Sequence, residues 1–391
     1  MSFTSMEKVY QKKVCILTVG LLSLGGSFLP LKEVKMERIK VGIVGLGDGG
    51  KSNLKSLEGV PRAEVVALCD SNLEVLKKAH SETKKKFRTF ARAENLVLDP
   101  EVELVVVATP DHLHLEVAKA ALEAGKYVFV EKPLATTPAD LAVFKKLAGE
   151  YHGKLLFSEK YSFAYPVQET LENIKELGGF MGGSTFYTMW NCDRIMGGGK
   201  WRTETAYNPC AGGLSHNFMV ALLFARSPII RAKATGRVTT YHENLDKCGG
   251  YDTMEGVLEF SSGKFLHWFI CLATRDKESS FGHRFAYRTV THNFQFLNGI
   301  LVYGAMPWKD RLMVGEREEY FQREPDEKEW PEYNLAILYR GMHENLLRAF
   351  LGEKPLHDIH HGINVAAACA LAFESAKKDG VWLEIPKEFQ F

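Results

Sequence analysis

The sequence lacks several features that mark other classes of protein. Its formal net charge is only +1 at pH 7, so no charge excess favours nucleic acid or an acidic membrane surface as a partner. The seven cysteines are odd in number and include no C-x-x-C pair, which argues against a disulfide framework and against a zinc cage. The basic run Lys84–Lys86 is interpreted as a solvated helix end. We therefore expect no nucleic-acid partner and a reducing compartment.

The first 38 residues differ from the rest. Three lysines precede the apolar run Val14–Leu31, which glycines and a proline interrupt. This is the outline of a signal peptide, yet no A-x-A-like cleavage site follows. The run is also too short and glycine-rich for a spanning helix, which needs about 20 apolar residues. Residues 1–38 are thus a leader, an interaction segment, or a mis-assigned start before Met36. We expect a cytoplasmic protein, or an exported one if residues 1–35 are a signal peptide.

Strand-like and helix-like segments alternate from residue 39 to 158. Compact apolar runs predict buried strands at 39–44, 64–69, 104–108, 127–130 and 154–157. Apolar residues at helical spacing lie between them, and Thr137–Pro138 has the features of a helix start. This order predicts an α/β domain over 39–158, with the doubly wound parallel sheet of a Rossmann fold.

The pattern changes after residue 158. Strand-like segments follow one another without helices between them, at 184–190, 230–241, 253–260, 264–272, 285–294 and 300–303. Helical spacing returns at 339–351 and 363–377. We therefore predict that residues 159–391 form an α+β domain with a large, mostly antiparallel open sheet.

A G-x-G-x-x-G pattern follows the first predicted strand and opens a helix. Its first glycine permits a tight turn, its second lets a pyrophosphate approach the backbone, and its third lets helix and strand pack closely. Asp70 ends the next strand and can accept hydrogen bonds from a ribose 2′-hydroxyl, which favours NAD, with NADP as the alternative. The predicted cofactor contacts in this region are Gly45, Leu46, Gly47, Asp48, Gly50 and Asp70.

Two further polar segments follow later strands of the same predicted sheet. Ligands of open α/β sheets bind at the carboxyl ends of the strands, so both segments belong beside the nicotinamide. Lys132 then becomes a charged side chain at the reacting centre. The predicted cofactor contacts here are Thr109, Pro110, His114, Glu131 and Lys132.

At this point the chain resembles the glucose-fructose oxidoreductase, inositol 2-dehydrogenase and rhizopine-catabolism (Gfo/Idh/MocA) family. The resemblance rests on the stretches VGIVGLGDGG, LDPEVELVVVATPDHLHLEVAKAALEAGKYVFVEKPLA, WRTETAYNPCAGGLSH and FLGEKPLHDIHHGINVAAACALAFESAKKDGVWLEIP. It implies a Rossmann domain, a second domain on an open sheet, NAD(P)-linked chemistry on sugars or cyclitols, and a homodimer or homotetramer.

The resemblance also implies roles for residues outside the glycine loop. In the family, the lysine of the E-K-P segment contacts substrate and nicotinamide, a role that falls on Lys132. The family's D-x-x-x-H element supplies a proton-transfer histidine, which corresponds to His216, while Gly212 stands where the aspartate is expected. Trp201 and Arg202 resemble the W-R pair that precedes this element.

The implied chemistry suits these residue types. A histidine, whose ordinary pKa is about 6.5, can take the hydroxyl proton that hydride transfer leaves behind. A lysine cation stabilises the developing alkoxide. Glu159 and Tyr161 follow the crossover between the predicted domains and are expected to border the substrate pocket. The predicted catalytic residues are Lys132 and His216, and the predicted substrate contacts are Lys132, Tyr161, Trp201, Arg202 and His216.

No metal site is expected. His357, His360 and His361 cluster near the C-terminus, but only Asp358 is placed to complete a ligand set, and we interpret the cluster as a solvated loop.

Three functions fit the pattern. The first is an NAD(P)-dependent dehydrogenase or reductase acting on a small sugar or polyol. The second is a glycosidase or lyase that oxidises its substrate transiently, which the glycine at position 212 makes worth considering. The third is a non-catalytic regulator that senses dinucleotides, against which the presence of both Lys132 and His216 argues.

Overall fold

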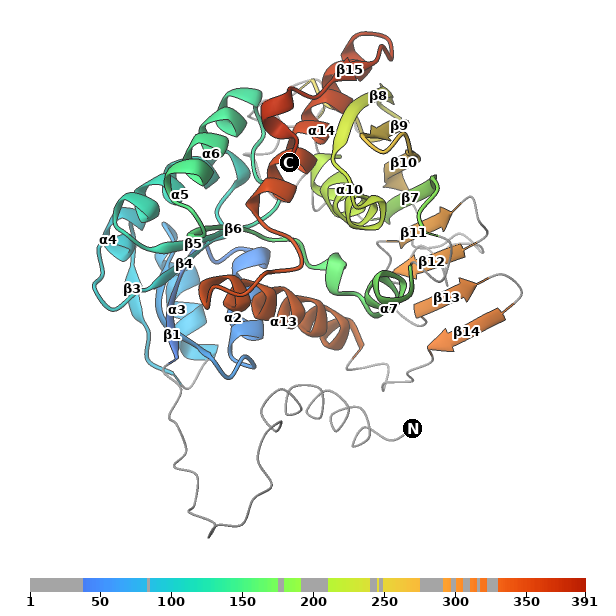
Figure 1. Cartoon of the computed structure of the whole chain (residues 1–391). Helices are drawn as coiled ribbons and strands as arrows, with labels where there is room; N and C mark the ends of the chain where they lie inside the picture. The colour runs from blue at the N-terminus through green and yellow to red at the C-terminus, as the bar shows by residue number, and fades with distance from the viewer. Residues whose placement is uncertain are drawn as a thin grey trace, which may run out of the picture. The chain divides into compact units, whose positions relative to one another are not determined.

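The structure is a computed structural model of the chain. It describes residues 38–82, 85–174, 179–190, 210–239, 245, 249–274, 291–296, 300–304, 310–314, 317–321 and 330–391. Figure 1 gives the arrangement of the helices and strands between residues 38 and 391.

The first part of the described chain builds a six-stranded sheet in the order β3-β2-β1-β4-β5-β6. Every pairing in it is parallel. Its strands are β1 (Ile39–Val44), β2 (Ala63–Cys69), β3 (Arg88–Phe90), β4 (Leu104–Val107), β5 (Tyr127–Val130) and β6 (Leu155–Phe157). The helices that connect them are α2 (Asp48–Leu57), α3 (Leu73–Glu82), α4 (Ala93–Val97), α5 (His114–Glu123) and α6 (Pro138–Glu150), with a short 3₁₀ helix η2 (Asp111–Leu113) before α5.

Local sequence explains why these elements begin and end where they do. All four residues of β4 are buried, as expected of an apolar strand covered on both faces. Thr137 caps α6 by accepting a hydrogen bond from the Asp140 N–H (3.1 Å), and Pro138 occupies the first helical position. The helix start predicted at Thr137–Pro138 is therefore confirmed.

The second part of the described chain builds a sheet of nine described strands, in the order β14-β13-β12-β11-β7-β10-β9-β8-β15. The β7–β10 pairing is parallel and the others are antiparallel. The strands are β7 (Gly183–Trp190), β8 (Ile229–Arg237), β9 (Thr253–Phe260), β10 (Phe265–Thr274), β11 (Thr291–Phe296), β12 (Ile300–Gly304), β13 (Asp310–Val314), β14 (Arg317–Phe321) and β15 (Leu383–Glu384).

Helices pack on one face of this second sheet. Helix α10 (Ala211–Ala225) contacts β7 and β10, and α14 (Ile359–Lys377) contacts β8 and β9. The remaining helices are η3 (Tyr161–Phe163) and α7 (Tyr165–Asn173), which follow the first sheet, α13 (Trp330–Phe350), and η4 (Lys387–Phe389). The predicted fold class, a Rossmann sheet followed by an α+β part with a mostly antiparallel sheet, is confirmed.

Helix α13 joins the first sheet although it lies late in the chain. It packs against α2, and its residues Tyr339, Met342 and Leu346 belong to the apolar core beside β1. The predicted domain boundary after residue 158 remains a prediction. Helix α13, from the C-terminal part of the chain, packs with α2 beside the first sheet, so the two sheets do not correspond simply to the two halves of the sequence. No helix of the described segments is long and apolar enough to cross a membrane.

Candidate functional site

The loop between β1 and α2 is shaped by glycines that cannot carry side chains. Gly45 has a φ of +91°, and a Cβ there would lie 2.5 Å from the Ala108 carbonyl oxygen. A Cβ on Gly50 would lie 1.9 Å from the Gly45 oxygen. At Gly47, by contrast, a Cβ would meet no atom within 4 Å, so the loop leaves open space at that residue. Helix α2 begins next, at the exposed residue Asp48, and presents its N-terminus to that space.

The residue after β2 reaches back to this loop. Asp70 Oδ2 accepts a hydrogen bond from the Leu46 N–H (2.8 Å), and Oδ1 accepts one from the Asn72 N–H (2.8 Å). The Leu46 side chain itself is buried in the core. Asn72 caps α3, because its Oδ1 accepts from the Glu74 N–H (3.0 Å). The Asp70 carboxylate is thus fixed beside the glycine loop.

A buried histidine joins the loops that follow β4 and β5. His114, the first residue of α5, has Nδ1 at 2.9 Å from the Pro133 oxygen and Nε2 at 3.1 Å from the Thr109 oxygen. The Lys132–Pro133 peptide bond is cis. Pro110 lies between Thr109 and η2. Thr109 Oγ1 is buried and has no hydrogen-bond partner among the described residues, as expected of a group that meets a ligand.

A second buried network connects the glycine-loop helix to the loop after β5. The Asn53 amide donates to Glu131 Oε1 (2.8 Å) and to the Gly49 oxygen (2.9 Å). Asn53 Oδ1 then faces His343 Nε2 at 2.8 Å, so Nε2 is the nitrogen that donates. The Ser56 hydroxyl donates to His343 Nδ1 (3.1 Å). Burial lowers the pKa of His343 to about 3, so this imidazole is neutral.

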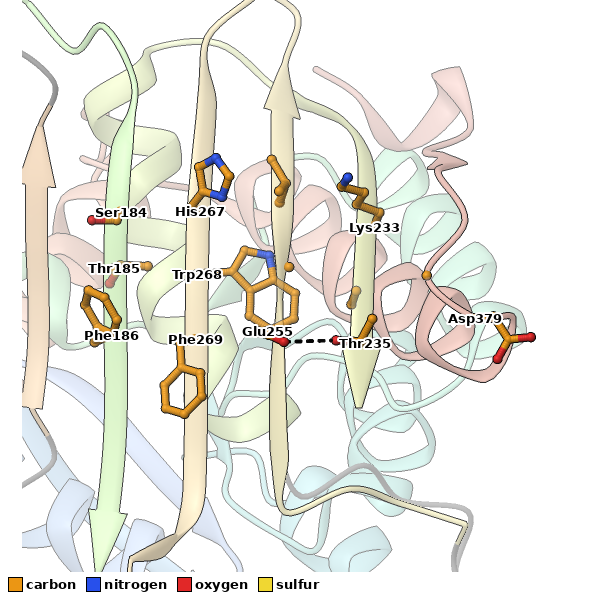
Figure 2. Close-up of a pocket in the computed structure, with 14 residues that line it drawn as sticks. Ser184, Thr185, Phe186, Lys233, Thr235, Glu255, His267, Trp268, Phe269 and Asp379 are labelled. Atoms are coloured by element: carbon orange, nitrogen blue, oxygen red, sulfur yellow. Dashed lines mark hydrogen bonds between the residues drawn. The ribbon is translucent and has the colours of Figure 1, made fainter. Parts of the chain in front are cut away.

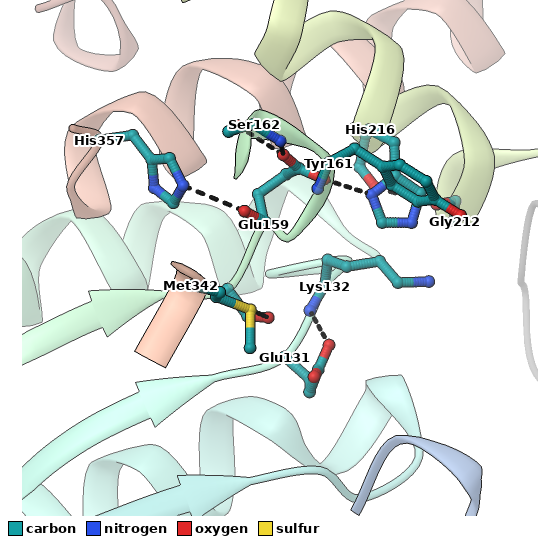
Figure 3. A network of polar contacts seen from close by, with 11 residues as sticks. Glu131, Lys132, Glu159, Tyr161, Ser162, Gly212, His216, Met342 and His357 are labelled. Atoms are coloured by element: carbon teal, nitrogen blue, oxygen red, sulfur yellow. Dashed lines mark hydrogen bonds and ion pairs between the residues drawn. The ribbon is translucent and has the colours of Figure 1, made fainter. Parts of the chain in front are cut away.

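The predicted catalytic lysine follows Glu131 directly. Glu131 Oε2 accepts from the Lys132 N–H at 3.2 Å, which orients the backbone of this loop. In Figure 3 the Lys132 side chain extends away from Glu131, and its end lies below the ring of His216 in this view. Lys132 and His216 come from the first sheet and from helix α10, respectively.

His216 is paired with a carboxylate. Its Nδ1 lies 2.5 Å from Glu159 Oε1, and the two side chains are 4% and 0% exposed. Glu159 follows β6 and was expected to border the substrate pocket, but its contact with His216 was not foreseen. Tyr161 packs on the same imidazole, with ring centroids 4.5 Å apart and an edge-to-face geometry.

A second lysine lies beside this pair. Lys160 Nζ lies 5.4 Å from the Tyr161 ring centroid and 4.9 Å from that of Tyr339, distances typical of cation–π contacts. Burial lowers the pKa of Lys160, but the opposing effect of Tyr339, Tyr161 and the two nearby carboxylates is larger, so its pKa is raised. Sequence reasoning did not single out Lys160 or Tyr339.

Some residues singled out in the sequence lie elsewhere. Trp201 and Arg202 fall outside the described residues. The interpretation of the C-terminal histidine cluster as a solvated loop is wrong for His357, which is 2% exposed and has Nε2 at 3.2 Å from the Glu159 oxygen. The neighbouring Asp358 caps α14. Within the described ranges, no group of three or more histidine, cysteine or acidic side chains is arranged to hold a metal ion.

Together these contacts define a dinucleotide-binding edge. The glycine loop, Thr109 and Glu131 all follow strands of one parallel sheet at their carboxyl ends, where such sheets bind ligands. The open space at Gly47, the carboxylate of Asp70 and the orphaned hydroxyl of Thr109 fit a nicotinamide dinucleotide. Fold and site therefore define a Rossmann-type nucleotide-binding protein in which Lys132 follows β5 at this edge.

The family follows from comparison with known proteins. Residues 39–159 match the model of the Gfo/Idh/MocA family, an oxidoreductase family with an NAD-binding Rossmann fold. This segment matches the family's Rossmann-fold model, so the predicted resemblance and the expected NAD-binding class are confirmed.

Individual relatives match mainly over the same segment. A stretch of 145 residues is 34% identical to inositol 2-dehydrogenase of Salmonella paratyphi B and covers 36% of this chain and 43% of that relative. Another, of 125 residues, is 32% identical to a glycosyl hydrolase family 109 protein of Shewanella amazonensis and covers 30% of this chain and 28% of that protein. The matches thus span less than half the length of these curated relatives.

The fold as a whole is similar to that of solved dehydrogenases. Scyllo-inositol dehydrogenase of Lactobacillus casei, solved with bound NAD(H) and scyllo-inositol, matches with a TM-score of 0.67 and 18% identity. The match covers 89% of this chain and 99% of that one, so it includes both sheets. At this identity the likeness establishes the shared fold.

Proposed function

We propose that this chain is an NAD-dependent dehydrogenase that acts on a CH–OH group of a cyclitol, sugar or sugar derivative. The observation that carries the proposal is that Lys132 follows β5 at the carboxyl edge of a family-matched Rossmann sheet, and that the buried His216 of α10 contacts Glu159, which follows β6 at the same edge. The relatives named inositol 2-dehydrogenase and the neighbour solved with scyllo-inositol support a polyol as substrate.

The cofactor would lie along the edge described above. Gly45, Gly47 and Gly50 would hold the pyrophosphate at the start of α2, with the Leu46 and Asp48 backbone beside it. Asp70 would accept hydrogen bonds from the adenosine ribose, which favours NAD over NADP. The nicotinamide side would be bordered by Thr109, Pro110, His114, Glu131 and Lys132. When bound, NAD supplies the hydride acceptor for the alcohol.

The chain's own residues handle the proton and the charge. His216 would take the hydroxyl proton through Nε2, since Nδ1 faces Glu159. The Lys132 ammonium would donate a hydrogen bond to the same oxygen and stabilise the negative charge that develops on it. Tyr161, together with Trp201 and Arg202, would contact the rest of the substrate.

A substrate panel tests the proposal. Sugars, inositols and uronic acids are offered with NAD and with NADP, and both NADH absorbance and product identity are followed. Lys132→Met should lower kcat by about 10²–10³-fold with little change in the Kd for NAD. The matched control is Lys119→Met, which removes an exposed lysine of α5 that pairs with Glu123 and should change neither quantity. Equal losses of kcat and NAD affinity in Lys132→Met would contradict its assignment.

A second candidate function is favoured by two observations. The chain is similar to a protein named as a glycosyl hydrolase, and Gly212 replaces the aspartate of the resembling element. In that case the substrate would be oxidised transiently by NAD, elimination would follow, and the NADH formed would return its hydride to the intermediate and so be re-oxidised to NAD. Product formed without accumulation of NADH would favour this candidate over a dehydrogenase.

We also propose that copies of the chain pair through the second sheet. Alternate residues of β10 differ in exposure: Phe265, His267 and Phe269 are exposed or half-buried, whereas their neighbours are buried beneath the helices. Phe186 of β7 is 47% exposed on the same face. Figure 2 shows Phe186, His267 and Phe269 at a hollow of about 460 Å³ on this face. A sheet face with exposed aromatic side chains fits a homodimer or homotetramer.

For location, we propose the cytoplasm. The four described cysteines Cys69, Cys210, Cys271 and Cys369 are free thiols, which fits a reducing compartment.

A further inference from the structure

The carboxylate beside His216 is held more firmly than an incidental neighbour would be. Glu159 Oε1 accepts from the Tyr161 N–H (2.9 Å), and Oε2 accepts from both the N–H (2.7 Å) and the hydroxyl (2.6 Å) of Ser162. The Glu159 carbonyl oxygen faces His357 Nε2 at 3.2 Å. Both the side chain and the backbone of Glu159 are therefore fixed, as Figure 3 shows.

These donors also bear on the charge of Glu159. Burial raises the pKa of this carboxyl, and the hydrogen bonds from Ser162 and Tyr161 oppose that effect. Three donated hydrogen bonds and an imidazole all favour the ionised form. A buried carboxylate with this set of partners can persist where an unpartnered one would take up a proton.

The contact determines which nitrogen of His216 can exchange a proton with a ligand. With a carboxylate oxygen 2.5 Å away, Nδ1 carries the proton, and acid–base chemistry with a ligand runs through Nε2. The Tyr161 ring packs against the imidazole in a T-shaped geometry, so two contacts restrict the rotation of the His216 ring. In Figure 3 the His216 ring and the Lys132 side chain both lie to the right of Glu159.

The carboxylate comes from a different element than the resembling sequence pattern suggests. Gly212, one turn before His216 on α10, has no side chain to offer. Glu159 lies 57 residues earlier in the chain, at the end of β6, and meets the histidine across the packing of η3 on α10.

We infer that Glu159 is the positioning residue of the site: its carboxylate fixes the orientation and tautomer of His216 in place of the missing aspartate. This inference rests on the proposed role of His216 in proton transfer. A histidine held by a carboxylate through Nδ1 is a stronger and better-oriented base at Nε2 than an unsupported one.

Several charged or titratable groups surround His216 and contribute to its titration. Glu159 and Tyr161 contact it directly, and Lys160 packs on Tyr161. Lys132 approaches from the end of β5. Glu159 is the group in hydrogen-bond contact with His216. Loss of its charge should therefore account for most of the difference in the His216 pKa between the wild type and Glu159→Gln.

The test is nitrogen NMR of the histidine side chains in the full-length protein, without substrate. The His216 signals are assigned by their loss in His216→Gln. We expect the wild-type ring to carry its proton on Nδ1, and Glu159→Gln to lower the His216 pKa by about 1–3 units, since an anion beside the imidazolium is lost. Glu259→Gln, which removes a carboxylate paired with Arg231 on the second sheet, is the matched control and should leave the His216 signals unchanged.

Steady-state kinetics provide a second test of the role of Glu159. Glu159→Gln should lower kcat by about 10²–10⁴-fold with little change in KM, and Glu159→Asp should recover part of the loss. A wild-type ring protonated on Nε2, or an unchanged His216 pKa in Glu159→Gln, would overturn the inference even if the enzyme is active. An Nδ1–H ring in a protein that oxidises no polyol would leave the pair intact and contradict the proposed function instead.

Discussion

At the scale of single residues, the cofactor loop contains adjacent glycines with opposite constraints. A Cβ at Gly50 would lie 1.9 Å from a backbone oxygen, whereas one at Gly49 would meet nothing within 4 Å. Gly50→Ala should therefore destabilise the protein by about 1–3 kcal/mol and abolish measurable NAD binding, because the backbone must move. Gly49→Ala, in helix α2, should stabilise by roughly 0.5–1 kcal/mol. Denaturant unfolding and calorimetric NAD titration measure both; similar behaviour of the two variants would contradict this reading of the loop.

Asp70 has two separable effects at the same loop. It holds the Leu46 N–H, and its charge would repel a 2′-phosphate. Asp70→Ala should weaken binding of both cofactors and lower the ratio of NAD to NADP affinity by about tenfold or more, equivalent to about 1.4 kcal/mol. Asp70→Asn keeps an acceptor for Leu46 and should change the ratio with a smaller loss of overall affinity. If the ratio is unchanged in both variants, Asp70 does not face the ribose.

Residues of the site could be predicted from the sequence only where a local motif places them. The glycine spacing and the strand ends predicted Gly45, Asp70 and Lys132 as site residues, because a tight turn and a sheet edge impose local requirements. The Glu159–His216 contact joins residues 57 positions apart, and no local pattern encodes which distant carboxylate meets a histidine. The missing aspartate at Gly212 was the one signal that a replacement was needed.

At the scale of elements, α13 couples the C-terminal part of the chain to the cofactor helix. Its His343 is fully buried and connects Ser56 and Asn53 of α2, and Asn53 in turn holds Glu131. A neutral imidazole satisfies both hydrogen bonds of His343, whereas a protonated one would leave a buried charge. Helix α13 therefore supports the loop that carries Lys132 and makes its geometry sensitive to acid.

The buried histidines predict how stability depends on pH. Burial lowers the pKa of His343 to about 3 and that of His357 to about 4, well below the roughly 6.5 of an unfolded histidine. Their contribution to the free energy of unfolding is complete above about pH 6.5. It is lost as the pH falls toward the pKa values of these histidines in the folded state. The slope is about 1.4 kcal/mol per pH unit for each histidine in that window.

Unfolding of a variant pair isolates the contribution of His343. His343→Gln should be less stable than the wild type at neutral pH and should lose less stability between about pH 6 and pH 4.5. The control is His80→Gln, which replaces an exposed histidine of α3 and should keep the wild-type slope. If the stability of His343→Gln falls with pH as steeply as that of the wild type, burial of this imidazole does not contribute to the pH dependence.

Element boundaries were predictable where the sequence has strong start signals or sharp apolar runs. Strands β5 and β9 were predicted with the bounds that the structure shows, 127–130 and 253–260. Helix α13 begins at Trp330, nine residues before the predicted start at 339. Strands β13 (DRLMV) and β14 (REEYF) were not predicted, because both are short and carry charges that interrupt an apolar pattern. In β14, which ends the described sheet, such charges protect an edge from aggregation.

At the scale of the whole described unit, the second sheet has one covered and one open face. Because the open face carries exposed aromatic side chains, we expect the wild type to sediment as a dimer or tetramer. Phe186→Asp, at a 47% exposed position, should shift the protein toward monomer, whereas Leu98→Asp, at a 71% exposed position near the first sheet, should not. Sedimentation velocity measures both. A monomeric wild type, or an unchanged mass in Phe186→Asp, would rule out this face as the interface.

The arrangement of the two sheets brings the cofactor edge and the His216 pair together, and the proposed chemistry depends on that meeting. The most direct measurement is a crystal structure of the chain with NAD bound. The proposal requires the pyrophosphate at Gly45–Gly50 and the nicotinamide ring beside the Lys132 ammonium and the His216 imidazole, with the space between these two side chains left for the substrate hydroxyl. A dinucleotide bound elsewhere, or a ring turned away from both side chains, would contradict it.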